Sequence, residues 1–185
     1  MSLLTQQRDL LRLLQGADAA AVPGAATDPY LASVAGTEAL GIVQEIGLWW
    51  REYSIEQWCR LTSALLKQRG TFSETVATFS VMEGLSRFIE EVGTRFMDAM
   101  GAHPDPLVAN VARFEAAIIR AAQGDAAVDC VLVWDRDPAL VVARLVEGAP
   151  VDECPRGAFR SRVSAALPRL FEVEPLGAPA PAGRP

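Results

Sequence analysis

Hydrophobic residues recur at helical spacing over the first two thirds of the chain. The leucines between positions 3 and 14 fall on one side of a helix that Ser2 can cap and Gly16 can end. Similar runs continue to residue 123 and predict five or six helices, and the loops after residue 36 are short. Because short loops favour antiparallel neighbours, residues 1–124 are expected to form a helical bundle.

Two signals inside this region predict interruptions. The Ala/Gly/Pro-rich segment 17–29 predicts a connector without fixed structure. Ser54 and Gln57 match a capping box, which predicts that one helix ends and another begins at this point.

Three Asp-Pro pairs predict helix starts, because aspartate caps the first turn and proline fits the first helical position. Asp28-Pro29 begins a short helix, PYLASVA. Asp105-Pro106 begins the last helix of the bundle. Asp137-Pro138 begins a shorter helix that ends at Gly148.

The pattern changes to that of β-strands after residue 127. Three short runs are rich in β-branched and aromatic residues: VDCVLVW (128–134), FRSRV (159–163) and LFEVE (170–174). We therefore expect a small antiparallel three-stranded sheet with one helix over residues 125–175, and a disordered tail over residues 176–185. The fold class predicted for the whole chain is α+β, mainly α.

The composition of the chain limits the classes of protein to which it can belong. The net charge of −6, without a run of basic residues, argues against nucleic-acid binding. No window approaches the ~20 apolar residues of a membrane span. Arg8, Asp9 and Arg12 interrupt the apolar start, unlike a secretory signal, and three scattered cysteines suit a reduced cytoplasm. Half of the residues are hydrophobic, which indicates a large core or an apolar surface kept for a partner.

Few residues offer catalytic chemistry. The single histidine, His103, lies in a predicted turn, and no zinc, nucleophile-elbow or phosphate-loop motif occurs. Carboxylates are paired at Glu90-Glu91 and at Asp152-Glu153, but neighbouring positions on a helix do not face each other. An enzyme that acts without metal through such carboxylates stays open as the least favoured hypothesis.

The tryptophans form the first unusual set: Trp49, Trp50, Trp58 and Trp134. Core packing is one interpretation, in which Trp50 and Trp58 meet if the helices turn back at Ser54. In the other, one member of the adjacent pair must point outward, so Trp49 or Trp50 anchors a partner.

The strand FRSRV is the second unusual feature. Its apolar and small side chains alternate with Arg160 and Arg162, which therefore share one face. Beside an exposed sheet edge, two arginines would suit an acidic peptide added as a further strand. A solvated charged face on a protected edge is an equally open interpretation.

A family resemblance sharpens this hypothesis. VLVWDRDPALVVARLVEG followed by FRSRVSAALPRLFEVE, downstream of a helical half, resembles the MbnC-like proteins of methanobactin biosynthesis and related systems. These small partner proteins are encoded beside multinuclear-iron oxygenases that modify ribosomally made peptides. The resemblance covers residues 128–174 most closely and the rest of the chain loosely.

The resemblance implies a heterodimer with an MbnB-like TIM-barrel subunit, which holds the iron and activates dioxygen. That complex oxidises cysteines of an MbnA-like precursor peptide to oxazolone and thioamide groups of a copper chelator. This chain would carry no cofactor, would not be an enzyme on its own, and would present the peptide's cysteine to the iron.

The residues expected to bind the leader peptide form two segments of the sheet: Phe159, Arg160, Ser161, Arg162, Val163, Leu170, Phe171 and Glu172. Trp49 and Trp50 are expected at the interface with the enzyme subunit. The alternative from another class is a stand-alone helical scaffold or regulatory protein.

Overall fold

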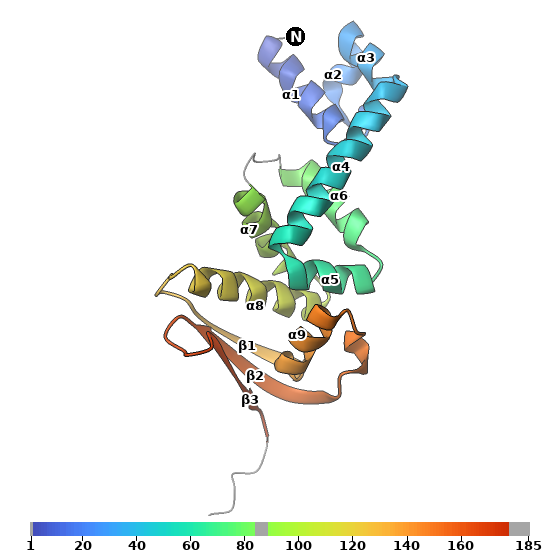
Figure 1. Cartoon of the computed structure of the whole chain (residues 1–185). Coiled ribbons are helices and arrows are strands. Elements are labelled where there is room, and N and C mark those ends of the chain that lie inside the picture. The colour runs from blue at the N-terminus through green and yellow to red at the C-terminus, as the bar shows by residue number, and fades with distance from the viewer. Residues whose placement is uncertain (1, 84–88, 178–185) are drawn as a thin grey trace, which may run out of the picture. The chain divides into compact units, whose positions relative to one another are not determined.

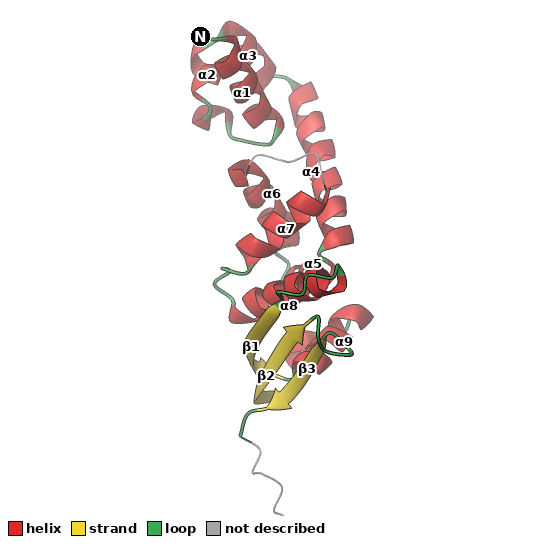
Figure 2. Cartoon of the chain, turned by 90° about the vertical axis from the view of Figure 1, so that its left-hand side faces the viewer, coloured by secondary structure: helices red, strands yellow, loops and turns green. Residues whose placement is uncertain are grey.

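The computed structural model describes residues 2–83 and 89–177 (Figure 1). Contacts divide the chain into two compact units. The first holds Met1–Trp58 and Thr71–Gly93, and the second holds Cys59–Gly70 and Thr94–Pro185. The predicted fold class is confirmed, since the described residues are mainly helical with one antiparallel three-stranded sheet (Figure 2).

The regular elements of the first unit are all helices over its described residues. Its helices are α1 (Leu3–Leu14), α2 (Pro23–Thr27), α3 (Pro29–Ala35), α4 (Glu38–Trp58), α6 (Phe72–Glu83) and the start of α7 (Ile89–Met100), with a short 3-10 turn at Ala19–Ala21. Ser2 caps α1 as predicted, since its Oγ accepts the N–H of Thr5 at 3.2 Å. Leu13, Leu31 and Leu40 lie in a common hydrophobic cluster.

The prediction of an unstructured connector is wrong. The buried carboxylate of Asp9 in α1 accepts the N–H of Gly24 at 3.0 Å, next to the first residue of α2. A Cβ on Gly24 would collide with that carboxylate. The segment is therefore held by a contact with α1 that its own composition does not reveal.

The predicted break at Ser54 is also wrong, because α4 runs without interruption to Trp58. The Ser54 hydroxyl donates to the Trp50 carbonyl at 2.8 Å within the helix instead of capping a new one. Trp50 and Trp58 therefore lie on the same helix and do not meet across a turn. The next helix, α5, begins at Arg60.

The second unit packs helices on one face of the sheet. It contains α5 (Arg60–Gln68), the end of α7, α8 (Pro106–Ala122), β1 (Asp129–Arg136), α9 (Pro138–Glu147), a 3-10 turn at Val151–Glu153, β2 (Arg156–Ser164) and β3 (Phe171–Pro175). All three Asp-Pro predictions are confirmed, since Asp28 caps α3 in the first unit and Asp105 and Asp137 cap α8 and α9 in this one. Gly148 takes the left-handed conformation, φ 71°, that ends α9.

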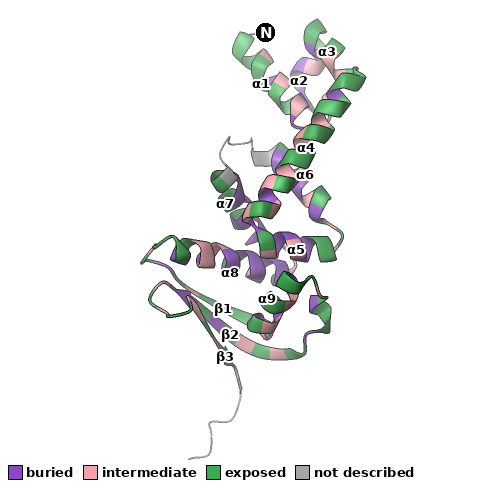
Figure 3. Cartoon of the chain, viewed as in Figure 1, coloured by how far each residue is buried: buried purple, intermediate pink, exposed green. Residues whose placement is uncertain are grey.

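The sheet has the order β1-β2-β3, with both pairs antiparallel. Its inner face packs against α8 and is largely buried (Figure 3). Trp134 is buried there, donates its indole N–H to the Ser161 hydroxyl at 2.8 Å and packs edge-on against Phe114. Trp134 thus fits the core-packing interpretation.

The residue before α5 is Cys59, whose side chain makes no capping hydrogen bond to the helix. Glu115 of α8, 5% exposed, supplies the missing acceptor. Its carboxylate accepts the N–H of Leu61 at 2.8 Å and both the N–H and the hydroxyl of Thr62 at 2.9 and 2.7 Å. This contact ties α5 to a helix far along the chain and explains why both belong to one unit.

The predicted domains, 1–124 and 125–175, remain a prediction, while the compact units group α5 and α8 with the sheet. Of the predicted disordered tail, residues 178–185 lie outside the described residues. No helix within the described ranges is long and apolar enough to cross a membrane.

Candidate peptide-binding surface

The outer face of the sheet carries three columns of side chains, one from each strand. Register sets Val133 opposite Arg160, which in turn faces Glu174. It likewise sets Val131 opposite Arg162, which faces Glu172. A hollow of about 250 Å³ on this face is lined by Val131, Arg160, Arg162, Glu172 and Glu174. The surface thus combines hydrophobic side chains with both signs of charge.

The arginines of this face are paired but accessible. Arg160 lies 2.9 Å from the Glu174 carboxylate, with both side chains about half exposed. Arg162 donates two hydrogen bonds to Asp129, at 2.8 and 3.1 Å, and holds the pKa of that carboxyl below its usual value. Exposed ion pairs of this kind contribute only ~0–1 kcal/mol to folding stability. A carboxylate of a ligand can therefore replace Glu174 or Asp129 as the partner of an arginine at little cost.

The predicted peptide-binding residues divide between the two faces of the sheet. Arg160, Arg162 and Glu172 lie together on the outer face, as the alternation predicted. The others face inward or lie in the turn before β3: Phe159, Ser161, Val163, Leu170 and Phe171.

The inward set has structural contacts. Ser161 and Val163 are fully buried, and Phe171 packs edge-on against Phe114 with ring centres 5.2 Å apart. Leu170 takes a left-handed conformation, φ 63°, which is unusual for a residue with a branched side chain. The structure therefore brings only three of the eight residues to a common exposed surface.

Of the two segments expected to bind the leader beside a sheet edge, FRSRV lies in the central strand β2, which pairs with both neighbours, and only β3 lies at an edge. The hydrogen bonds Ser164 N to Leu170 O, at 2.8 Å, and Leu176 N to Ala158 O, at 2.7 Å, bracket the β2–β3 ladder. In an antiparallel pair, alternate residues turn their backbone groups away from the partner. Phe171 and Val173 therefore direct theirs to the open side of β3.

The two outer strands differ in how open they are. On β1, the Val133 carbonyl already accepts a hydrogen bond from Asn110 Nδ2 of α8 at 2.8 Å. On β3, no further strand pairs with the outer edge among the residues that the structure describes. β3 is the more open of the two edges, and Pro175 ends its row of donors.

Trp49 and Trp50 are both exposed on α4, by 57% and 55%. Their rings pack edge-on with centres 4.9 Å apart, and Trp49 also stacks on Tyr53. Core packing therefore does not describe this pair. Trp58, by contrast, is half-buried and lies against Gly93 of α7.

The residues considered for catalysis have structural roles. His103 Nδ1 accepts the N–H of Asp105 in the turn before α8, at 3.1 Å. The described residues include no cluster of three side chains that could hold a metal ion. Cys130 is half-buried and Cys154 is buried, and burial raises the pKa of both thiols.

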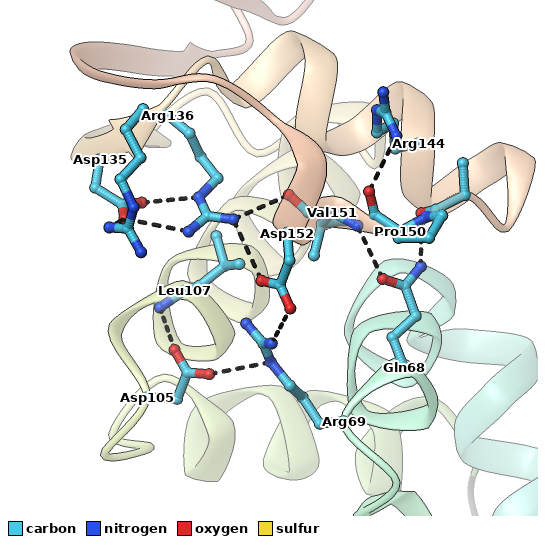
Figure 4. Close-up of polar contacts among 12 residues, drawn as sticks. Gln68, Arg69, Asp105, Leu107, Asp135, Arg136, Arg144, Pro150, Val151 and Asp152 are labelled. Atoms are coloured by element: carbon cyan, nitrogen blue, oxygen red, sulfur yellow. Dashed lines mark hydrogen bonds and ion pairs between the residues drawn. The ribbon is translucent and has the colours of Figure 1, made fainter.

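The carboxylates near the end of β1 belong to an ion-pair network (Figure 4). Asp152 lies 2.6 Å from Arg69 and 3.5 Å from the buried Arg136. Asp135 pairs with Arg136 at 3.1 Å and Arg156 at 2.8 Å. These arginines lower the pKa of both aspartates, which therefore stay ionised and are poor proton donors near neutral pH.

Sequence reasoning missed several exposed residues near both surfaces. Val131 and Val133 are 54% and 62% exposed. Residues 130–134 of their strand are all apolar, so no alternation of polar and apolar residues marks which side chains face outward. On α4, Ile42, Ile46 and Tyr53 share the side of Trp49, and their helical spacing is a signal that could have found them.

Comparison with protein families, curated proteins and solved structures gave no match.

Proposed function

We propose that this chain is a non-catalytic partner subunit that binds the leader of a ribosomal precursor peptide and presents its cysteine to an iron oxygenase. The enzyme subunit would be MbnB-like and the peptide MbnA-like, with oxidation to oxazolone and thioamide groups. The iron belongs to the enzyme subunit, and the pair acts in the cytoplasm.

The observation that carries this proposal is the open edge of β3 beside the arginines of the outer face. A peptide strand added to β3 would pair with the outward backbone groups of Phe171 and Val173. Acidic side chains of that strand would compete with Glu174 and Asp129 for Arg160 and Arg162. Backbone pairing would supply affinity, and the arginines would select an acidic leader.

The first experiment is a pull-down of the tagged chain co-expressed with its genomic neighbours, followed by metal analysis of the eluate. A stoichiometric complex that contains iron, with none in this chain alone, supports the proposal. A metal-free chain without a copurifying protein contradicts it.

The second experiment is an anisotropy titration of the labelled leader peptide with the Arg160→Glu/Arg162→Glu variant. We expect weaker peptide binding without dissociation of the two subunits, because the arginines lie on the exposed face of the sheet. Arg156→Glu is a matched control, since Arg156 is exposed on the same strand but pairs with Asp135 outside the hollow. Unchanged affinity of the double variant would refute the arginine contact.

A stand-alone helical scaffold or regulatory protein is the second candidate. The exposed hydrophobic side chains of α4 favour it, because such a surface can bind a protein of any class. This alternative predicts that no iron protein copurifies with the chain and that the leader peptide does not bind to it.

A further inference from the structure

α4 carries a hydrophobic stripe that its own unit leaves exposed. Six large side chains of the helix are between 46% and 57% exposed: Ile42, Val43, Ile46, Trp49, Trp50 and Tyr53. We call this set the α4 stripe. Contiguous apolar surface of this kind is uncommon on a protein without partners and marks an interaction site.

The spacing of the stripe is that of a helix–helix seam. Ile42, Ile46, Trp49 and Tyr53 follow one another at intervals of four, three and four residues, the alternation of core positions in a coiled coil. The aromatic rings already contact one another, with Trp49 stacked on Tyr53 at 5.9 Å. These contacts hold the rings in place before a partner arrives, which lowers the entropy lost on binding.

The opposite side of α4 holds the first unit together. Leu40 and Ile55 are buried, Gln44 donates to the Leu13 carbonyl at 2.7 Å, and Arg51 donates to the Gln15 carbonyl at 3.3 Å. The helix therefore has two apolar sides, of which the unit uses one.

Negative charge along the α4 stripe indicates which kind of partner can bind to it. Glu38, Glu45 and Glu52 recur every seven residues along one border of the stripe. None of the three has an ion-pair partner within the described part of the chain. A partner with lysine or arginine opposite this border would gain attraction and selectivity.

A second copy of the chain does not meet this requirement. The only basic residue of α4 is Arg51, and its guanidinium is engaged at the Gln15 carbonyl on the other side of the helix. If two copies of α4 packed antiparallel along the stripe, the glutamates of one helix would face the glutamates of the other. If they packed parallel, the glutamates would face Val43, Trp50 and Gln57, none of which is basic.

We propose that the α4 stripe docks an amphipathic helix of a partner protein whose apolar seam is bordered by lysine or arginine. This inference deepens the partner contact of the proposed function and rests on it for the identity of the helix, which would belong to the enzyme subunit. The helical form and the basic border follow from the stripe alone.

The test uses two synthetic three-heptad helices with leucine at the seam, one with lysine and one with glutamate at the flanking positions. Labelled peptides are titrated with the full chain and followed by anisotropy. We expect the lysine peptide to bind about tenfold more tightly than the glutamate peptide, because only the former complements the glutamate border. Raising the salt concentration should shrink the difference.

Matched variants locate the binding site. Ile46→Ala should weaken binding of the lysine peptide about tenfold, whereas Val146→Ala, at a more exposed hydrophobic position on α9 in the other unit, should not. Glu45→Lys/Glu52→Lys should reverse the preference between the peptides. Glu147→Lys on the exposed end of α9 is the control for a charge change elsewhere.

Each remaining outcome contradicts part of the proposal. Equal affinity for the two peptides would overturn the basic border, and no binding of either would overturn the helix-docking surface. Concentration-dependent dimers of the free chain that Ile46→Ala abolishes would identify a second copy as the occupant.

Co-expression separates this inference from the proposed function. If the wild-type chain copurifies with an iron protein and the Ile46→Ala and double-lysine variants copurify equally well, the inference fails and the proposed function stands. If the peptide preference holds but no iron protein copurifies, the proposed function fails and the docking surface stands.

Discussion

At the scale of single residues, Glu115 is the side chain on which the start of α5 depends. Glu115→Ala leaves the N–H groups of Leu61 and Thr62 without their acceptor inside the unit. We expect a loss of about 2–3 kcal/mol in the free energy of unfolding, because buried donors lose their partner. Urea titration checks this, with the exposed Glu147→Ala as control. An unchanged midpoint would contradict the capping role.

The same carboxylate predicts a pH dependence. Burial raises the pKa of Glu115 above its ordinary value of 4.5, despite the hydrogen bonds that lower it. The folded state then holds more protons than the unfolded state, so its stability should fall as pH rises from about 4.5 towards the raised pKa. The unfolding free energy of the Glu115→Gln variant should lack this decrease with pH. The measurement is the difference in unfolding free energy between wild type and variant, followed across the pH range. Parallel pH profiles would refute the raised pKa.

Two glycines of the first unit give a paired prediction. A Cβ on Gly93 would overlap the indole of Trp58, whereas nothing lies within 4 Å of the Cβ position on Gly41. Gly93→Ala should therefore cost about 1–3 kcal/mol and shift the Trp58 emission. Gly41→Ala should stabilise by up to ~1 kcal/mol through helix propensity. Thermal unfolding of the two variants and the wild type tests both predictions. A Gly93→Ala variant as stable as the wild type would show that Trp58 can move aside.

At the scale of elements, the open side of β3 can be tested with proline. Val173→Pro removes a donor that points away from β2, so we expect a folded protein with weakened leader binding. Glu172→Pro removes a donor of the β2–β3 ladder and should cost about 1–3 kcal/mol. Thermal unfolding and the anisotropy titration separate the two effects. Full leader affinity in Val173→Pro would exclude strand addition at this edge.

The elements that the sequence predicted well are those specified by neighbouring residues. The caps at Asp105 and Asp137 act within one helical turn, and both were found. The alternation of FRSRV likewise predicted that Arg160 and Arg162 share a face.

What could not be predicted depends on distant contacts. The order of strands places β2 in the centre, which no local pattern encodes. The start of α5 depends on Glu115, more than fifty residues further along the chain. Ser54 illustrates a third case, since its position matches a capping box in the sequence, yet its hydroxyl makes a hydrogen bond inside a continuous helix.

At the scale of the whole molecule, neither unit is a continuous segment. The inner face of the sheet packs against α8, which precedes residue 125. A fragment of residues 125–177 should therefore remain largely unfolded by circular dichroism. A fragment of residues 103–177, which adds α8, should recover more of the sheet signal. Cooperative unfolding of the shorter fragment would show that the sheet and α9 suffice.

The capping of α5 by Glu115 also has a consequence for synthesis on the ribosome. The two partners are 54 residues apart, so α5 leaves the ribosome roughly 3–10 s before its acceptor at ordinary elongation rates. During that interval the N–H groups at the start of α5 lack their acceptor, and Leu65 and Leu66, which are fully buried in the finished protein, lack their neighbours from α8 and α9. Codon choice between positions 70 and 115 would then set how long a nascent chain is exposed to aggregation.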